Sequence, residues 1–160
     1  MHDLTDFTEI VGQLSHQNLS IATAESLTAG MLSSAIADVP GASAVFHGGI
    51  VAYNNNIKHR LLGVSVDTLA SRGAVDSDTA KQMAHGARQR FQTDIGISTT
   101  GVAGPDPSEG KAVGLTFIAL ASEENTTVKL LRFDGNRDHN RRATVAACVQ
   151  LMAEWLAEQK

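Results

Sequence analysis

Segments with the two-residue period of a strand alternate with segments of helical period along most of this chain. Strands are expected at 20–24, 46–53, 95–100, 113–121 and 127–133. Helices are expected at 4–14, 28–37, 55–62, 65–71, 77–91 and from 137 onward. The last two strands are separated by a short polar turn and should form an antiparallel hairpin. The order predicts an α/β fold, with residues 1–160 forming a single three-layer α/β/α domain around a mixed, largely parallel sheet.

Composition excludes several classes of protein. The chain has 160 residues, with 13 Lys and Arg against 17 Asp and Glu, and this net charge of −4 argues against a surface for nucleic acid or anionic membrane. Cys148 is the only cysteine, so neither an internal disulfide nor a thiolate zinc site is expected. No apolar run approaches the roughly 20 residues of a membrane span. No signal peptide is recognisable, so we expect a cytoplasmic protein, and a homo-oligomer on general frequency alone.

Three polar turns are predicted to meet at one edge of the sheet. The crossover from strand 20–24 to strand 46–53 should be right-handed and parallel, which places the carboxyl ends of both strands on one side. If strand 95–100 is parallel too, its end joins them. The polar residues brought together in this way are Glu25, Ser26, Thr28, Tyr53, Asn54, Asn55, Lys58, Thr99, Thr100 and Gly101.

These residue types suit acyl transfer. A serine hydroxyl needs a base to become a nucleophile, and none of the six histidines lies in a nucleophile-elbow motif. A lysine of lowered pKa can replace histidine, so Lys58 is the candidate base and Tyr53 a candidate relay. Main-chain amides at a helix start after Ser26 are candidate donors to an oxyanion or a phosphate.

Each candidate also has an ordinary structural explanation. Ser26 and Thr28 can cap a helix, and Lys58 can be a solvated surface residue. Glu25 can be a catalytic group or a buried acid beside a basic partner. The stretch 101–104 can be a simple turn.

Several blocks of the sequence resemble the CinA C-terminal domain family. Residues 23–30, Thr-Ala-Glu-Ser-Leu-Thr-Ala-Gly, are similar to its TAES-x-T-G-G signature. A second block is similar over 40–43 and 48–58, and a third over 62–64 and 73–75. The remaining matches are 100–105 with Val113-Gly114, and Gly135-Asn136-Arg137 with Arg141-Arg142. The blocks cover nearly the whole chain in the family's order, so together they are specific.

The resemblance implies an amidohydrolase that converts nicotinamide mononucleotide to nicotinate mononucleotide and ammonia without a metal or cofactor. Its partner would be this small pyridine mononucleotide. The family also occurs fused behind a larger nucleotide-processing domain, and we expect the stand-alone form here. The candidate catalytic residues are Ser26, Ser43, Tyr53, Lys58 and Thr100. The candidate substrate-binding residues are Glu25, Thr28, Gly30, Asn55, Gly101, Gly104, Arg137, Arg141 and Arg142, with the phosphate expected on one of the last two arginines or on the glycine-rich turn.

Two points stay open at the level of sequence. Ser26 lies at the same predicted edge as Lys58 and is the first choice of nucleophile, while Ser43, before the strand, is its rival. The segment 106–112 departs from the family's glycine-rich loop and is expected to border the ligand, and Ala29 and Asp76 are further departures. The alternative function is therefore a diverged, catalytically weak or inactive nucleotide-binding module.

Overall fold

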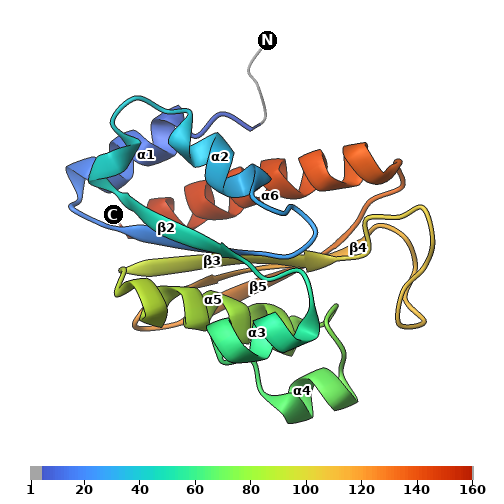
Figure 1. Cartoon of the computed structure of the whole chain (residues 1–160). Coiled ribbons are helices and arrows are strands. Elements are labelled where there is room, and N and C mark those ends of the chain that lie inside the picture. Colours follow the sequence, from blue (N-terminus) through green and yellow to red (C-terminus); the bar gives the residue numbers. More distant parts are fainter. Residues whose placement is uncertain (1–4, 160) are drawn as a thin grey trace.

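A five-stranded mixed sheet in the order β2-β1-β3-β4-β5 forms the centre of the computed structural model, which describes residues 5–159 (Figure 1). Its strands are β1 (Ile21–Glu25), β2 (Phe46–Val51), β3 (Ile95–Gly101), β4 (Leu115–Ala121) and β5 (Thr126–Arg132). β1 pairs in parallel with β2 and β3, whereas β4 is antiparallel to β3 and β5. The mixed sheet, the parallel first crossover and the closing hairpin are confirmed.

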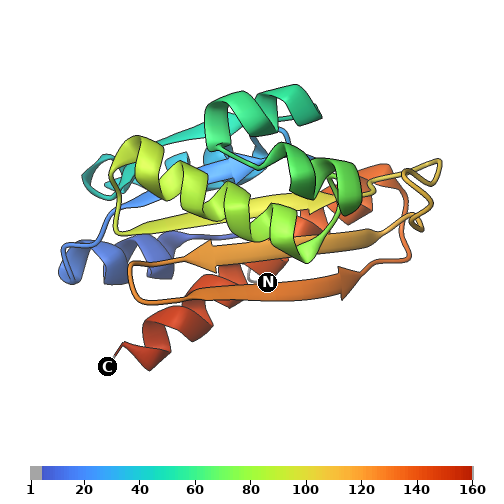
Figure 2. The same ribbon diagram turned by 90° about the horizontal axis from the view of Figure 1, so that it is seen from below.

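Helices cover both faces of this sheet, as the alternating pattern predicts. They are α1 (Thr8–His16), α2 (Met31–Ala37), α3 (Asn55–Leu62), α4 (Val66–Ser71), α5 (Ser77–Phe91) and α6 (Arg137–Glu158), with a short 3₁₀ turn, η1 (Ala42–Ala44). α1, α2 and α6 lie on one face, and α3, α4 and α5 on the other (Figures 1 and 2). None of the helices between residues 5 and 159 has the length and apolar character needed to span a membrane.

Side-chain alternation along β1 divides the core between these two layers. Ile21 packs with the apolar residues of α1, α2 and α6. Ala22 and Ala24 pack with residues of α3 and α5 on the opposite face. Because successive side chains of a strand point to opposite faces, the parity of a position in β1 decides which helical layer it meets.

Most helix boundaries follow from capping residues. The side chains of Asn54, Asp76 and Asn136 each accept a hydrogen bond from a first-turn amide of α3, α5 and α6, respectively. The first helix begins at Thr8, later than predicted, and Leu4 of its expected apolar face lies outside the described residues. α2 begins at Met31 instead of residue 28, since the backbone before it is left-handed, with φ 96° at Gly30.

Candidate active site

The polar turns after β1, β2 and β3 meet at one edge of the sheet, as the parallel topology predicts. The 102–114 loop and the start of α6 lie on the same side of the molecule (Figure 1). Together they enclose a hollow of about 320 Å³, here named the edge cleft. It is lined by Ser26, Leu27, Tyr53, Asn55, Lys58, Ala74, Val75, Thr100, Gly101, Val102, Ala103, Gly104, Asp106, Ser108, Glu109 and Arg137. Its volume is within the range of small-molecule sites.

Ser26 and Lys58 are directly hydrogen-bonded in this cleft. The Lys58 ammonium donates to Ser26 Oγ over 2.9 Å and to the main-chain carbonyl of Ala52 over 2.9 Å. Ser26 follows β1, and Lys58 is on the first turns of α3, which follows β2. Asn54 caps α3 through Ile57 N and thereby fixes where the lysine leaves the helix. The arrangement is that of a nucleophile within reach of a base.

Burial changes the acidity of Lys58. Its side chain is 1% exposed, and no carboxylate is among its hydrogen-bond partners. Desolvation lowers the pKa of Lys58 to about 8, although the negative charge of Glu109 acts in the opposite direction. A lysine of this pKa is partly neutral near pH 8 and can accept a proton from a hydroxyl.

Glu25 stabilises the serine-bearing turn and does not line the edge cleft. Its carboxylate accepts hydrogen bonds from Leu32 N at 2.8 Å, Ser33 N at 3.0 Å and Ser33 Oγ at 2.6 Å. The carboxylate thus caps α2 from the face opposite to α3 and α5, as its odd position in β1 requires. Its proposed role in substrate binding is replaced by a structural one.

The first amides of α2 are therefore not available to a ligand. Leu32 N and Ser33 N are bound by Glu25, and Ser26 N donates to the carbonyl of Thr99 at 3.0 Å. Leu32 N and Ser33 N therefore cannot serve as the oxyanion or phosphate donors expected at this helix start, because the Glu25 carboxylate occupies them. Gly30 serves as the left-handed residue before α2 and is not among the residues that line the cleft.

Thr28 and Arg141 make further hydrogen bonds at the same turn. Thr28 is fully buried, and its hydroxyl lies 2.8 Å from that of Thr99. Arg141 Nε donates to the carbonyl of Leu27 at 2.8 Å, and its Nη2 donates to that of Thr28 at 3.2 Å. Neither Thr28 nor Arg141 lines the edge cleft, so the structure does not bring them to a ligand there.

Arg137 is the arginine of the 137–142 cluster that reaches the edge cleft. Its guanidinium donates to the carbonyl of Gly104 at 2.6 Å and to the hydroxyl of Tyr53 at 2.8 Å. Tyr53 therefore orients Arg137, and the Lys58 ammonium makes its hydrogen bonds to Ser26 and Ala52 instead of to Tyr53. Arg142 instead forms an exposed ion pair with Asp138 at 2.9 Å. Neither Arg141 nor Arg142 lines the edge cleft, because α6 directs one to main-chain carbonyls and the other to an exposed ion pair.

Thr100 lines the cleft at the end of β3, and its hydroxyl donates to the carbonyl of Ala74 at 2.6 Å. This bond ties the strand edge to the segment between α4 and α5. Asn55 and Gly101 line the cleft as well. Like the other predicted residues that line the cleft, these three lie at the edge where the sequence places them.

Ser43 lies away from the edge cleft. It is an exposed residue of η1 and precedes β2, while Lys58 follows that strand. The six residues of β2 alone extend roughly 20 Å. Within one chain the structure therefore pairs Lys58 with Ser26 and not with Ser43.

Glu109 is a charged residue of the cleft that the sequence analysis did not single out. Its carboxylate accepts hydrogen bonds from Ala74 N at 2.9 Å and Val75 N at 3.3 Å. These bonds, with the nearby Lys111 ammonium, hold the pKa of Glu109 below its ordinary value despite partial burial. The segment 106–112 was expected to border the ligand, and Asp106, Ser108 and Glu109 do line the cleft.

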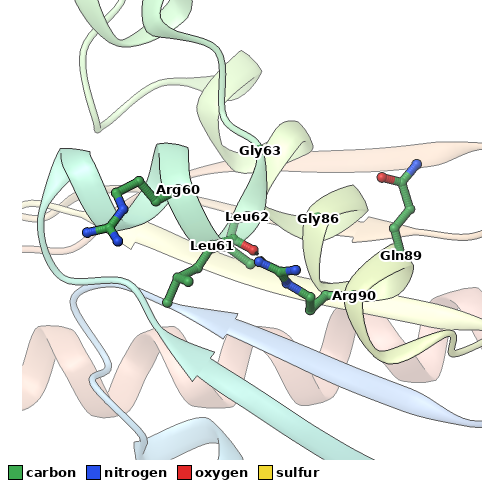
Figure 3. Close-up of a pocket in the computed structure, with 7 residues that line it drawn as sticks. All are labelled: Arg60, Leu61, Leu62, Gly63, Gly86, Gln89 and Arg90. Carbon is green, nitrogen blue, oxygen red and sulfur yellow. Dashed lines mark hydrogen bonds between the residues drawn. The ribbon is translucent and has the colours of Figure 1, made fainter.

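A second hollow of about 460 Å³ lies between α3 and α5 (Figure 3). It is lined by Arg60, Leu61, Leu62, Gly63, Gly86, Gln89 and Arg90. Its lining offers no hydroxyl, thiol, imidazole or carboxylate. The edge cleft is therefore the better candidate for chemistry.

Comparisons with known proteins agree with the fold. The family model of the CinA C-terminal domain matches residues 5–156. A competence-damage inducible protein of Desulforamulus reducens is 46% identical over 149 residues, which is 92% of this chain and 36% of that protein. A CinA-like protein of Frankia casuarinae is 43% identical over 148 residues, 92% of this chain and 34% of its own length. The chain thus spans about a third of the curated relatives it matches.

Solved structures match over nearly the whole chain. The competence/damage inducible protein CihA of Agrobacterium tumefaciens superposes with a TM-score of 0.91 at 35% identity, covering 96% of each chain. A CinA superfamily protein of Klebsiella pneumoniae superposes with a TM-score of 0.93 at 28% identity, covering 98% of each. On the family model and these likenesses, the chain belongs to the CinA C-terminal domain family.

Proposed function

We propose that this chain is an amidohydrolase that deamidates nicotinamide mononucleotide to nicotinate mononucleotide and ammonia. The observation that carries the proposal is the buried Lys58 ammonium on Ser26 Oγ, inside a cleft of ligand size. The choice of substrate comes from the family resemblance and from the arginine at the cleft's rim. A nucleotide phosphate suits the planar, bidentate donors of Arg137.

The chemistry proceeds in two steps. Neutral Lys58 takes the proton of Ser26 Oγ, which attacks the carboxamide carbon and forms a tetrahedral intermediate. The C–N bond then breaks, and Lys58 returns the proton to the leaving nitrogen, which departs as ammonia. Water next attacks the serine ester, with Lys58 again as base, and the acid product leaves with Ser26 restored.

The cleft supplies anchors on both sides of this pair. Arg137 is held by Gly104 O and Tyr53 OH, which use two of the five N–H donors of its guanidinium. Three N–H groups remain for a phosphate. Asn55 and the 101–104 turn supply further polar groups around the sugar.

The decisive experiment measures ammonia and nicotinate mononucleotide formed from nicotinamide mononucleotide by the purified chain. The unchanged chain should release both products in equal amounts, and Ser26→Ala should release neither. Ser43→Ala is the matched control, since it removes the same hydroxyl from an exposed turn outside the cleft. Tight binding of the nucleotide without product would instead identify a nucleotide-binding module. Loss of activity in Ser43→Ala, with activity retained in Ser26→Ala, would identify Ser43 as the nucleophile.

A further inference from the structure

Charges of opposite sign line the edge cleft. Its positive groups are Lys58 and Arg137, and its negative groups are Asp106 and Glu109. Lys58 is engaged with Ser26 at the floor. Arg137 and Glu109 are the two oppositely charged rim groups whose positions are fixed by hydrogen bonds to the main chain.

The two rim charges are anchored in different layers of the molecule. Arg137 opens α6, which lies on the same face of the sheet as α1 and α2 (Figure 1). Glu109 is bound by Ala74 and Val75, which lie between α4 and α5 on the opposite face. A ligand in the cleft therefore has a cation on one side and an anion on the other.

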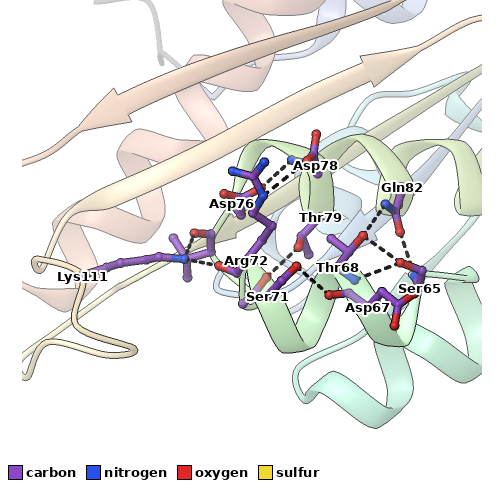
Figure 4. A network of polar contacts seen from close by, with 12 residues as sticks. Ser65, Asp67, Thr68, Ser71, Arg72, Asp76, Asp78, Thr79, Gln82 and Lys111 are labelled. Atoms are coloured by element: carbon purple, nitrogen blue, oxygen red, sulfur yellow. Dashed lines mark hydrogen bonds and ion pairs between the residues drawn. The ribbon is translucent and has the colours of Figure 1, made fainter.

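The Glu109 carboxylate is built into its position. Gly73, with φ +87°, allows its close approach, because a Cβ at that residue would lie 2.4 Å from Glu109 Oε2. Lys111 ties the same loop down by donating to the carbonyls of Arg72 and Val75 (Figure 4). The Lys111 ammonium lies 3.5 Å from the carboxylate, but Lys111 is not among the residues that line the cleft. Glu109 thus presents its negative charge to the cleft from a fixed support.

We infer that Glu109 is a specificity residue that faces a positively charged ring, while Arg137 holds the phosphate of the same molecule. The inference rests on the proposed function and narrows the class of substrate that the cleft accepts. Nicotinamide joined to ribose through its ring nitrogen carries one positive charge, and the phosphate is negative. The cleft then selects a zwitterionic N-ribosyl pyridinium amide over an amide with a neutral ring.

A matched pair of ligands tests this selection. Nicotinamide mononucleotide and its 1,4-dihydro form share the amide, the ribose and the phosphate, but only the first has a charged ring. Affinities are measured by calorimetry at pH 8 in the Ser26→Ala background, so that neither ligand is consumed. We expect the charged form to bind about tenfold more tightly, in the range of a partly exposed ion pair, with a smaller ratio at high salt.

Variants then assign the preference to one side chain. Glu109→Gln should weaken binding of the charged form about five- to tenfold and leave the dihydro form unchanged, so that the ratio approaches one. Glu109→Asp, which keeps the charge, should retain part of the preference. Glu123→Gln is the matched control, since it makes the same change of charge in the turn between β4 and β5. Thermal unfolding confirms that each variant is folded.

The outcomes separate this inference from the proposed function. Equal affinity for the two ligands in the Ser26→Ala chain overturns the inference without any mutation of the loop. The inference is also overturned if Glu109→Gln still binds the charged ligand more tightly than the dihydro form by the same ratio. A clear preference for the charged ring, lost in Glu109→Gln, supports the inference even if the unchanged chain releases no ammonia. In that case the amidohydrolase proposal fails and a binding module for zwitterionic nucleotides stands.

Discussion

Lys58 donates a hydrogen bond to Ser26 Oγ over 2.9 Å, although the two residues are 32 positions apart in the chain. The contact exists because β1 and β2 are parallel neighbours, so that the residues after each strand meet. Both partners are nearly inaccessible to solvent, Ser26 at 8% and Lys58 at 1%. The pair is thus a product of the sheet's topology and not of any local motif.

Single substitutions of this pair should be as damaging as the double one. We expect Ser26→Ala and Lys58→Ala each to abolish deamidation, with the double variant little worse, because nucleophile and base act as a unit. Single-turnover ammonia release measures all three. Activity close to that of the unchanged chain in Lys58→Ala would rule out the serine–lysine mechanism.

The pH dependence should report Lys58. Its neutral form is the base, so kcat/KM should rise with pH and level off above an apparent pKa of about 8. The negative charge of Glu109 raises the pKa of Lys58, so Glu109→Gln should move this rise to lower pH. Initial rates between pH 6 and 9.5 provide both profiles. A profile that is flat through this range would contradict the assignment.

Lys58 should also lower the stability of the fold at neutral pH. Its pKa is about 8 in the folded chain and 10.5 for an unperturbed lysine, so the unfolded chain binds the proton more tightly. The penalty is full below pH 8 and disappears as pH rises toward 10.5. We expect Lys58→Met to raise the free energy of unfolding by about 1–3 kcal/mol at pH 7, and by less at pH 10. Urea unfolding at both pH values tests this, and an equal gain at both would point to packing instead of charge.

The three arginines of α6 should separate into three classes. Arg137→Gln should raise KM for the nucleotide by a factor that corresponds to about 1.5–3 kcal/mol of binding free energy. The variant should also lose the enzyme's preference for the nucleotide over the riboside. Arg142→Gln removes only an exposed ion pair and should be nearly silent. Arg141→Ala should instead lower stability by about 1–3 kcal/mol, because the carbonyls of Leu27 and Thr28 lose their donor. Steady-state kinetics with both substrates and thermal unfolding distinguish the three, and a strong loss of substrate preference in Arg142→Gln would refute this order.

A chelator should leave deamidation unchanged. Within the described part of the chain, no three His, Cys, Asp or Glu side chains cluster in a way that could hold a metal ion. The reaction proposed above draws its base from Lys58 alone. Activity lost in EDTA and restored by one divalent ion would show that this account of the base is incomplete.

The sequence predicts the order of elements well, because local signals mark most boundaries. Asn54, Asp76 and Asn136 are side-chain caps, and each accepts the first-turn amide that a cap should accept. The meeting of Ser26 with Lys58 follows from parallel pairing, which the order of strands and helices already implies. Local capping signals and the order of strands and helices were thus sufficient to predict these helix starts and this contact.

The contacts that the sequence did not predict depend on side-chain direction and on partners distant in the chain. Glu25 could have been placed correctly, since its odd position in β1 puts it on the same face as Ile21 and toward α2. The partners of Arg141 depend on how α6 docks against the turn after β1, which no pattern in either segment records. The Arg142–Asp138 pair lies within α6 at i,i+4 spacing and could have been predicted. Glu109 is in an aperiodic loop, and its role depends on the amides of Ala74 and Val75, 35 and 34 positions away.

The hydrogen bonds between the Glu25 carboxylate and the first amides of α2 decide when the turn after β1 becomes ordered. Together with the hydrogen bond from Ser26 N to Thr99 O, they immobilise the backbone around Ser26 as the chain folds. This segment is therefore already ordered before a ligand binds. The amides of Ser26, Leu32 and Ser33 should gain little protection from hydrogen exchange when a ligand occupies the cleft. Newly acquired protection should concentrate in the aperiodic 102–106 segment of the cleft wall, which precedes the anchored residues Glu109 and Lys111.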